Sequence, residues 1–283
     1  MNNANNPILV SIMMPVYNGL PLIKASVESL INQTYQNWEC IVIDDGSVDG
    51  TSQYLDTIVD PRFKIYHQEN MGRPVARQRA LDIASGKYLA MLDAGDLYHP
   101  QKIERQVSLL ESRPEISLVT TSICSFGTHH DNIYIRGVKV TTDKSFDGSN
   151  HPIHAPSLLR MKRAKLCNYN PKLRLGEDQD FLEKYLVVGD VYMYLSDVYY
   201  YYSELDSVSK EKIRKNYFLY AVKYFRESKY KMSLIFTLKY FYSLIVFPFV
   251  SIDKLLSQRG CQPTDEDLEQ YIENCKSLVD KCI

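Results

Sequence analysis

The first hundred residues alternate between short apolar runs and segments with helical periodicity. Residues 8–14 (ILVSIMM), 40–43 and 87–92 (KYLAML) are near-continuous apolar runs, which predict buried strands. Between them, residues 20–33 and 74–85 place apolar side chains at helical spacing. Strands that are apolar on both faces and alternate with helices predict an α/β fold with a Rossmann-type, mainly parallel sheet and helices on both faces.

The rest of the chain has a different pattern. Residues 116–126 and 191–202 predict further strands, the second with six tyrosines, and the polar stretch 128–152 predicts loops. After residue 210 the pattern is helical only, and residues 232–250 are strongly apolar. We therefore expect an α/β domain over 1–209, with halves at 8–100 and 101–209, and a C-terminal helical region over 210–283.

The composition excludes several classes of protein. The chain has 283 residues, 33 Lys+Arg and 34 Asp+Glu, and this balance argues against a nucleic-acid partner. The six cysteines form no CxxC pair and no zinc-type cluster with histidine. The first residues, MNNANNP, lack the basic start and apolar run of a signal peptide. We expect reduced cysteines and a location in the cytoplasm or at the inner face of the cell membrane.

The near-zero net charge conceals an uneven distribution. Residues 1–100 carry seven basic and eleven acidic residues, whereas residues 210–239 carry nine basic and two acidic ones. A basic helical segment rich in Tyr and Phe is typical of peripheral contact with anionic headgroups, here through 210–250. A soluble helical hairpin explains the pattern equally well, so both interpretations stay open.

Two acidic motifs follow predicted strands. Asp44 and Asp45 come directly after the run at 40–43, and Asp93 and Asp96 follow the run at 87–92. Open parallel sheets bind ligands at the carboxyl ends of their strands. Carboxylates there can bind ribose hydroxyls, base donors, or a divalent metal that shares phosphate oxygens. A single motif of this kind is usually only a turn, but two at adjacent strand ends indicate a functional site.

Four segments of the chain, taken together and in this order, resemble glycosyltransferase family 2. The segments are SIMMPVYNG (11–19), QTYQNWECIVIDDGSVDGT (33–51), ENMGRPVARQRALDIASGKYLAMLDAGD (69–96) and GEDQDF (176–181). The resemblance covers residues 8–205 in order and spacing. It implies a GT-A type fold, a nucleotide-sugar donor, a divalent metal (Mn²⁺ or Mg²⁺) and inversion at the anomeric carbon. The dinucleotide motif GxGxxG and the P-loop motif are both absent.

The resemblance also implies roles for individual residues. It assigns the nucleotide-sugar site to Pro15, Tyr17, Asn18, Asp44, Asp45, Asn70, Gly72, Arg77, Asp93 and Ala94. It assigns the metal to Asp93 and Asp96, the catalytic pair to Glu177 and Asp178, and an acceptor-side contact to His154. Asp178 is the expected general base. The chain departs from the family pattern at Gly95, where a metal-binding aspartate is usual, so Asp96 is expected to replace it or metal binding to be weak.

The resemblance implies an inverting, metal-dependent glycosyltransferase that adds a single sugar, with UDP as the expected nucleotide. The QxxRW signature of processive synthases is absent. The expected acceptor is a saccharide or a lipid-linked saccharide in cell-surface polysaccharide synthesis, such as O-antigen, capsule or exopolysaccharide. Because Gly95 replaces a metal ligand, the alternative is a non-catalytic nucleotide-sugar-binding subunit. A nucleotidyltransferase is disfavoured because MMPVYNGLP carries no basic residue.

Overall fold

The structure of the chain is a computed structural model that divides into two compact units. It describes residues 8–126, 133–173, 176–203, 210–226, 228, 230–250 and 261–281. The first unit comprises Met1–Cys124, Gly137–Tyr202 and Pro263–Ile283. The second comprises Ser125–Arg136 and Ser203–Gln262.

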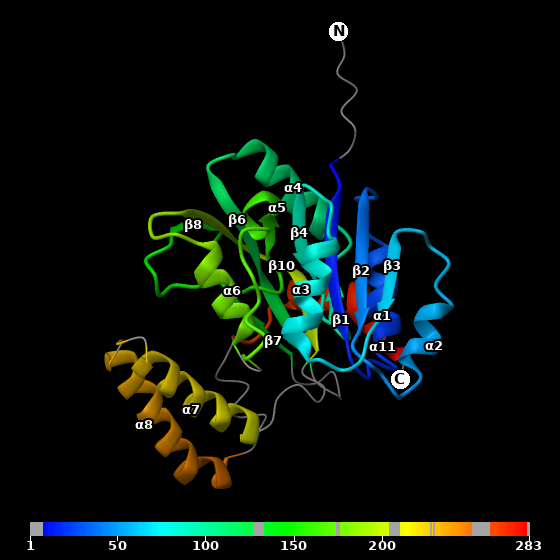
Figure 1. The fold of residues 1–283 in the computed structure, drawn as a ribbon. Coiled ribbons are helices and arrows are strands. Elements are labelled where there is room, and N and C mark those ends of the chain that lie inside the picture. Colours follow the sequence, from blue (N-terminus) through cyan, green and yellow to red (C-terminus); the bar gives the residue numbers. More distant parts are fainter. Residues whose placement is uncertain are drawn as a thin grey trace. The chain divides into compact units, whose positions relative to one another are not determined.

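Four parallel strands form one half of the sheet in the first unit (Figure 1). Their order is β3-β2-β1-β4, with bounds β1 (Val10–Val16), β2 (Trp38–Asp44), β3 (Phe63–His67) and β4 (Tyr88–Met91). In the register, Ile12 pairs with Cys40 on one side and with Ala90 on the other. Every residue of β1, β2 and β4 is buried, which explains why the sequence shows unbroken apolar runs there.

Helices cover both faces of this sheet, as the sequence predicts. Alternate residues of β1 point to opposite faces: Ile12 and Met14 pack with helices α1 (Ile23–Ile31) and α4 (Lys102–Ser112), whereas Met13 packs on the other side. The second face is covered by α3 (Arg73–Ile83), α5 (Met161–Ala164) and α6 (Glu177–Tyr185). The short helix α2 (Thr51–Asp56) lies between β2 and β3 along the chain.

The other half of the sheet is antiparallel. Strand β9 (Leu158–Arg160) lies between β4 and β6 (Ile116–Phe126) and is antiparallel to both. Strand β10 (Val191–Ser203) pairs antiparallel with β5 (Leu97–Tyr98) and with β8 (Thr142–Ser145). The expected α/β class is therefore confirmed, and the N-terminal half of the sheet is parallel. The predicted loop region 128–152 contains β7 (Tyr134–Arg136), which is too short to show a strand pattern, and β8, which is both short and polar.

The last helices belong to the first unit. They are α10 (Asp265–Tyr271), η2 (Ile272–Lys276) and α11 (Ser277–Asp280). Tyr271, Cys275 and Val279 are buried at a spacing of four residues, and α11 packs against α1. The structure therefore differs from the expected grouping of 210–283 as one helical region, because this single apolar stripe is buried in the first unit.

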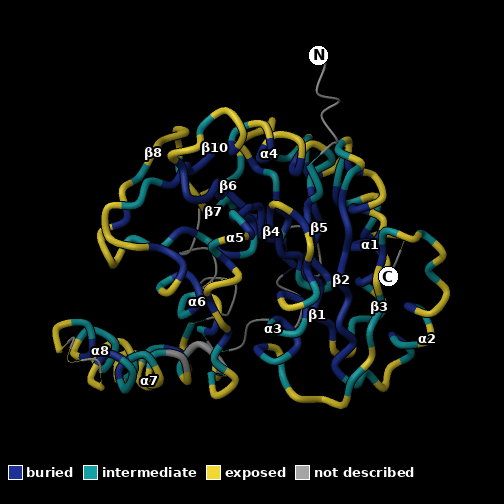
Figure 2. The backbone as a smooth tube through the Cα atoms, turned by 45° about the horizontal axis from the view of Figure 1, so that its top comes forward, coloured by how far each residue is buried: buried dark blue, intermediate teal, exposed yellow. Residues whose placement is uncertain are grey.

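The second unit contains a helical hairpin. Its helices are α7 (Lys210–Arg226) and α8 (Tyr230–Val246), and α8 continues into the short helix η1 (Phe247–Phe249). The segment Tyr230–Phe249 is long and apolar enough to cross a membrane, by length and composition. Only 11% of this segment's most apolar window is buried, and most of α8 has exposed or intermediate colour in Figure 2.

Candidate functional site

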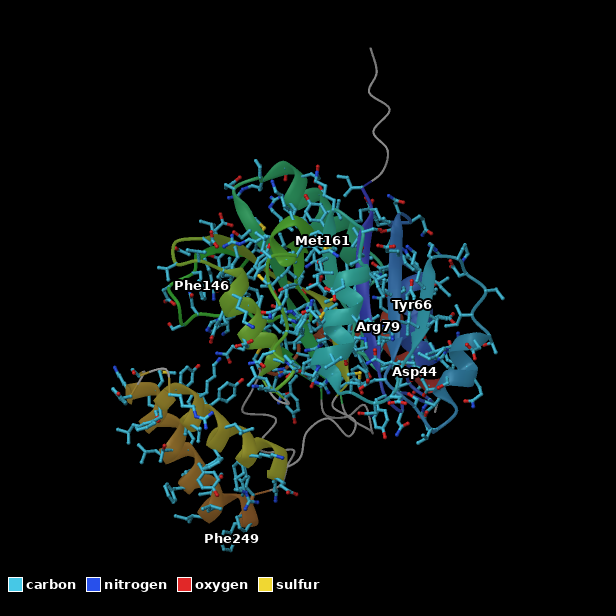
Figure 3. The ribbon with its side chains drawn as sticks, viewed as in Figure 1. Asp44, Tyr66, Arg79, Phe146, Met161 and Phe249 are labelled. Atoms are coloured by element: carbon cyan, nitrogen blue, oxygen red, sulfur yellow. The ribbon has the colours of Figure 1, made fainter. Side chains whose placement is uncertain are left out.

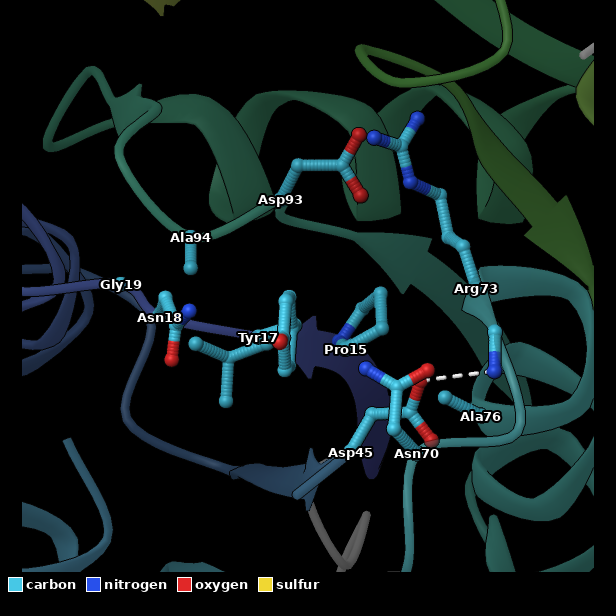
Figure 4. Close-up of a pocket in the computed structure, with 12 residues that line it drawn as sticks. Pro15, Tyr17, Asn18, Gly19, Asp45, Asn70, Arg73, Ala76, Asp93 and Ala94 are labelled. Carbon is cyan, nitrogen blue, oxygen red and sulfur yellow. Dashed lines mark hydrogen bonds between the residues drawn. The ribbon is translucent and has the colours of Figure 1, made fainter. Parts of the chain in front are cut away.

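A cavity of about 400 Å³ opens at the carboxyl ends of β1, β2 and β4 (Figure 4). Its lining residues are Pro15, Val16, Tyr17, Asn18, Gly19, Asp45, Asn70, Gly72, Arg73, Ala76, Asp93 and Ala94. They come from the loop after β1, from both acidic motifs and from the start of α3. The volume is in the range of small-molecule sites.

The loops after β1 and β2 are linked by hydrogen bonds through Asn18. Its backbone nitrogen donates to Ser47 Oγ at 2.9 Å, and its Oδ1 accepts from the Val48 nitrogen at 2.9 Å. Asn18 adopts φ 52°, a left-handed conformation that asparagine tolerates better than most residues. The preceding residue, Tyr17, is about half exposed at the cavity. This local geometry keeps an aromatic ring and an amide at the mouth of the site.

Asp45, the second residue of the first acidic motif, lines the cavity and positions the loop before α3. Its Oδ1 accepts from the Met71 nitrogen at 2.9 Å and from Gln68 Nε2 at 2.7 Å. Its Oδ2 accepts from the Gly72 nitrogen at 2.8 Å. Gly72 has φ 92°, which side-chain-bearing residues rarely adopt. The carboxylate therefore fixes a turn that requires glycine and forms one wall of the cavity.

Asp44, its neighbour, is buried and does not line the cavity. It accepts from the Ser47 nitrogen at 3.0 Å, from the Ser52 hydroxyl, and interacts with His67 Nδ1 at 2.8 Å. Burial raises the pKa of Asp44, but the hydrogen bonds from Ser47, Ser52 and His67 outweigh it and hold the pKa below its usual value. The contacts of this carboxylate organise the loop after β2.

In the second acidic motif too, one aspartate lines the cavity and the other does not. Asp93 lines the cavity, and both its oxygens accept from Arg77 Nη2, at 2.9 and 3.0 Å. Asp96 is buried and accepts from the Tyr200 hydroxyl at 2.6 Å. Gly95 lies between them at φ 103°. In each motif, one aspartate faces the cavity and the other forms hydrogen bonds that stabilise the surrounding structure.

Arg77 connects the cavity to helix α6. Its side chain is only 4% exposed and binds Asp93 through Nη2 and Glu177 through Nη1, the latter at 3.1 Å. Arg73 lies one turn earlier on α3, is 62% exposed, and approaches Glu177 at 3.6 Å. In Figure 4 the guanidinium of Arg73 reaches towards the Asp93 carboxylate. Burial raises the pKa of Asp93, but the charges of Arg77 and Arg73 outweigh it, so the carboxyl stays ionised.

The predicted catalytic pair begins α6. Glu177 is buried against Arg77, whereas Asp178 is exposed. The charge of Asp178 acts on both Arg77 and His154, so it lies near the buried network without being enclosed by it.

His154 lies in the same network. It is buried, its Nε2 lies 3.1 Å from the Tyr169 hydroxyl, and its ring packs edge-on against Phe181. Burial and then the charge of Arg77 lower its pKa to about 4, so the ring is neutral near pH 7. Its Nδ1 has no hydrogen-bond partner among the described residues. His154 does not line the cavity.

The geometry does not fit a protein-built metal site. Both oxygens of Asp93 accept from Arg77, Asp96 is bound to Tyr200, and Gly95 has no side chain. Among the described residues, no three His, Cys, Asp or Glu side chains gather in a group that could hold a metal ion. The expected ligation by Asp93 and Asp96 therefore lacks geometric support, and metal dependence stays a prediction.

The structure brings most of the predicted donor-site residues together. Those that line the cavity are Pro15, Tyr17, Asn18, Asp45, Asn70, Gly72, Asp93 and Ala94. Those outside the lining are Asp44, Arg77, Asp96, His154, Glu177 and Asp178. The prediction omitted Arg73, which is the cavity's exposed cation. The segment ENMGRP contained the signal for this residue. Its arginine, Arg73, begins helix α3, which faces the first acidic motif.

Comparison with known proteins gives consistent results. Residues 11–168 match the family model of glycosyl transferase family 2. The chain is 39% identical over 108 residues to TuaG of Bacillus subtilis (strain 168), a glycosyltransferase assigned by name to teichuronic acid biosynthesis. It is 43% identical over 103 residues to WfgD of Escherichia coli, a UDP-Glc:α-D-GlcNAc-diphosphoundecaprenol β-1,3-glucosyltransferase. These matches cover 37% and 36% of this chain, and 43% and 41% of the two relatives.

A solved structure shows the same fold. TarS of S. aureus in complex with UDP superposes with a TM-score of 0.63 at 21% identity, over 98% of this chain and 83% of that chain. A second TarS structure, with UDP-GlcNAc, gives a TM-score of 0.61. Together with the family match over more than half of the sequence, the ordered strand-end motifs and the cavity they line place the chain in glycosyl transferase family 2.

Proposed function

We propose that the protein is an inverting glycosyltransferase that transfers one sugar from a nucleotide-sugar, with UDP as the nucleotide, to a saccharide or lipid-linked acceptor. One observation carries the proposal. The cavity at the strand ends is lined by residues that the family resemblance assigns to the donor, and an Asp93–Arg77–Glu177 network, in which Arg77 and Glu177 are buried, leads from it to the exposed Asp178.

The loops after β1 and β2 would bind the nucleoside. The ring of Tyr17 is half exposed and offers an apolar face to a base, while Asp45 and Asn70 offer oxygens to base or ribose donors. Asp45 already accepts from two backbone nitrogens, so its position is set before a ligand arrives. Such preorganisation lowers the entropic cost of binding.

The diphosphate would lie beside Arg73. This guanidinium is the exposed cation of the described cavity lining, and its planar donors suit phosphate oxygens. Since Arg77 is enclosed by Asp93 and Glu177, its charge supports the carboxylates and leaves Arg73 to meet the donor. Among the described residues, no cluster of ligands lies ready to hold a metal beside the diphosphate.

Asp178 would act as the general base. As the acceptor oxygen attacks the anomeric carbon, the Asp178 carboxylate takes the hydroxyl proton. The bond between the anomeric carbon and the diphosphate oxygen breaks on the opposite face, and its electron pair leaves with the diphosphate. An exposed carboxylate at the start of a helix suits this role.

The relatives support a role in cell-surface polysaccharide synthesis, and we propose that the enzyme works at the cytoplasmic face of the membrane. WfgD is named for a diphosphoundecaprenol-linked acceptor, and TuaG for teichuronic acid biosynthesis. A lipid-linked acceptor would require the enzyme to work at a membrane surface.

A transfer assay tests the proposal. The full chain is incubated with UDP-, dTDP- and GDP-sugars and a GlcNAc-diphosphate acceptor on a short alkyl chain, with Mn²⁺ or with EDTA. The expected product carries one added sugar, of inverted anomeric configuration by NMR. A nucleotide-sugar that raises the melting temperature without any transfer would instead identify a non-catalytic binding subunit.

A further inference from the structure

Helix α8 has two apolar faces, and only one of them is packed. Its inner face meets α7: Phe236 lies 5.1 Å from Tyr220 and 5.5 Å from Tyr224 between ring centroids, and Tyr240 lies 5.6 Å from Phe218. The Ser233 hydroxyl donates to the Ala221 carbonyl at 2.8 Å. These contacts hold the hairpin together without using the opposite face.

The opposite face is an exposed apolar stripe. Leu234, Leu238, Phe241, Tyr242 and Ile245 are each between 56% and 70% exposed. Their spacing of three, four and seven residues places them along one side of the helix. Phe249, which is 88% exposed, extends the stripe at the end of the hairpin (Figure 3). A surface helix normally keeps this side polar, so the stripe requires an apolar partner.

Positive charge accompanies the stripe. Residues 210–239 contain nine Lys or Arg and two acidic residues. Lys215, Arg226, Lys231 and Lys239 are exposed on the two helices. Lys239 lies halfway along α8, off the line of the stripe, with its Nζ 5.0 Å from the Phe236 ring centroid. Apolar side chains flanked by cations complement an anionic lipid surface, where acyl chains and headgroup phosphates lie side by side.

We infer that the outer face of α8 docks in the plane of an anionic membrane, with the stripe in the acyl boundary and the flanking cations among the headgroups. Lying in the plane keeps Lys239 at the headgroup level, whereas a spanning helix would bury its charge at mid-bilayer. The 17 residues of α8 provide an apolar edge about 25 Å long at 1.5 Å per residue. The inference rests on the proposed function only for the purpose of the docking, which is access to a lipid-linked acceptor.

Vesicle flotation of the full chain tests the docking without any substrate. We expect binding to vesicles of phosphatidylcholine with 30% phosphatidylglycerol and at least tenfold weaker binding in 0.5 M salt or to pure phosphatidylcholine, orders of magnitude set by electrostatic attraction. The double variant Leu238→Glu/Ile245→Glu should lower binding at least tenfold. The matched control, Val59→Glu/Val188→Glu, adds the same charge at exposed apolar positions of the first unit and should bind as the wild type does.

The outcomes separate the possible occupants of the stripe. Absent vesicle binding, or equal binding by the stripe variant, overturns the inference. A wild-type dimer that the stripe variant converts to a monomer, without lipid binding, would assign the face to a second copy. Retention after alkaline extraction would overturn the in-plane arrangement. All substituted side chains are exposed, so melting temperatures should match the wild type and exclude misfolding.

A transfer measurement distinguishes this inference from the proposed function. The stripe variant should keep its turnover of the short-chain soluble acceptor and lose at least tenfold on the same acceptor embedded in anionic vesicles. Vesicle binding without transfer to either acceptor would leave the docking intact and count against the proposed function. Transfer to both acceptors at equal rates by the variant would overturn the docking instead.

Discussion

The cavity edge of the first unit and the hairpin of the second depart from ordinary surface chemistry in opposite ways. At the cavity edge, charged groups are buried and paired: Arg77, Glu177, Asp44 and Asp96 are nearly inaccessible and each has a named partner. On α8, large apolar side chains are exposed along a continuous stripe. Buried charge and exposed apolar surface are both costly, so each marks a region that serves something beyond folding.

Because the two regions differ in this way, substitutions in one should not impair the function of the other. Substitutions at the cavity edge should alter chemistry, donor binding or stability, because charges there hold one another in place. Substitutions on the stripe should alter only where the enzyme works.

The largest effect is expected from Asp178→Asn. An amide cannot take the acceptor proton, so kcat should fall about 10³-fold, within the range of general-base contributions. The thermal shift produced by the nucleotide-sugar should remain, because Asp178 does not line the cavity. Asp180→Asn, which alters a carboxylate paired with Lys184 on the same helix, is the control and should stay active. Undiminished turnover of Asp178→Asn would refute the assigned base.

Arg77→Met should damage folding. The substitution leaves Glu177, and in part Asp93, buried without their cation, which costs about 3 kcal/mol of unfolding free energy. Urea denaturation measures this loss. Arg79→Met on the same helix removes a more exposed guanidinium and should cost less than about 1 kcal/mol. Equal stability of the two variants would show that the buried network contributes little.

Arg73→Ala should weaken donor binding and spare the fold. Losing one charged hydrogen bond to the diphosphate should raise the donor KM about tenfold. Because Arg73 is 62% exposed, the melting temperature should hardly change. Arg73→Lys keeps the charge without the planar fork and should fall between wild type and alanine. An unchanged KM in all three proteins would remove Arg73 from the donor site.

The smallest effect concerns a carboxylate at the other end of β2. Glu39 accepts from Ser11, Ser85 and Lys64. Burial raises the pKa of Glu39, but the bonds from Lys64, Ser11 and Ser85 outweigh it and lower the pKa to about 2. A lowered folded-state pKa stabilises the protein above the unfolded value of about 4.3, and this stability is lost as the pH falls through about 2.

The stability difference between wild type and Glu39→Gln should therefore be about 1 kcal/mol smaller at pH 3 than at pH 7. Urea denaturation at both pH values measures it. Turnover at pH 7 should change less than about twofold, because Glu39 lies away from the cavity lining. A large loss of activity would show that buried carboxylates outside the cavity edge also contribute to the reaction, which would weaken the comparison.

Much of the first unit could be predicted because its signals are local. Unbroken apolar runs marked β1, β2 and β4, and the predicted strand at 116–126 coincides with β6. The predicted helices at 20–33 and 74–85 correspond to α1 and α3; α1 is shorter at both ends, and α3 begins one residue earlier and ends two residues earlier than predicted. The antiparallel half was harder to predict, because short strands such as β8 are exposed and polar and show neither a period nor an apolar run.

The candidate site was predictable as a set of positions but not as an arrangement. The motifs indicated that both acidic pairs lie at strand ends, where a parallel sheet collects them. They did not reveal that Asp45 and Asp93 face the cavity while Asp44 and Asp96 turn away. That choice depends on partners far along the chain, such as Tyr200 for Asp96, and on the exposure of Arg73 beside the buried Arg77.

The sequence by itself determined the α/β class, the strand ends that carry chemistry and the basic, aromatic character of α7 and α8, because periodicity and composition act over a few residues. Only the tertiary structure decided which charges pair, since Arg77 meets Glu177 across a separation of 100 residues. It also decided that Tyr271 and Val279 return to the first unit, and that one face of α8 is left exposed. Burial is a property of what packs against a residue, and that is set by contacts distant in sequence.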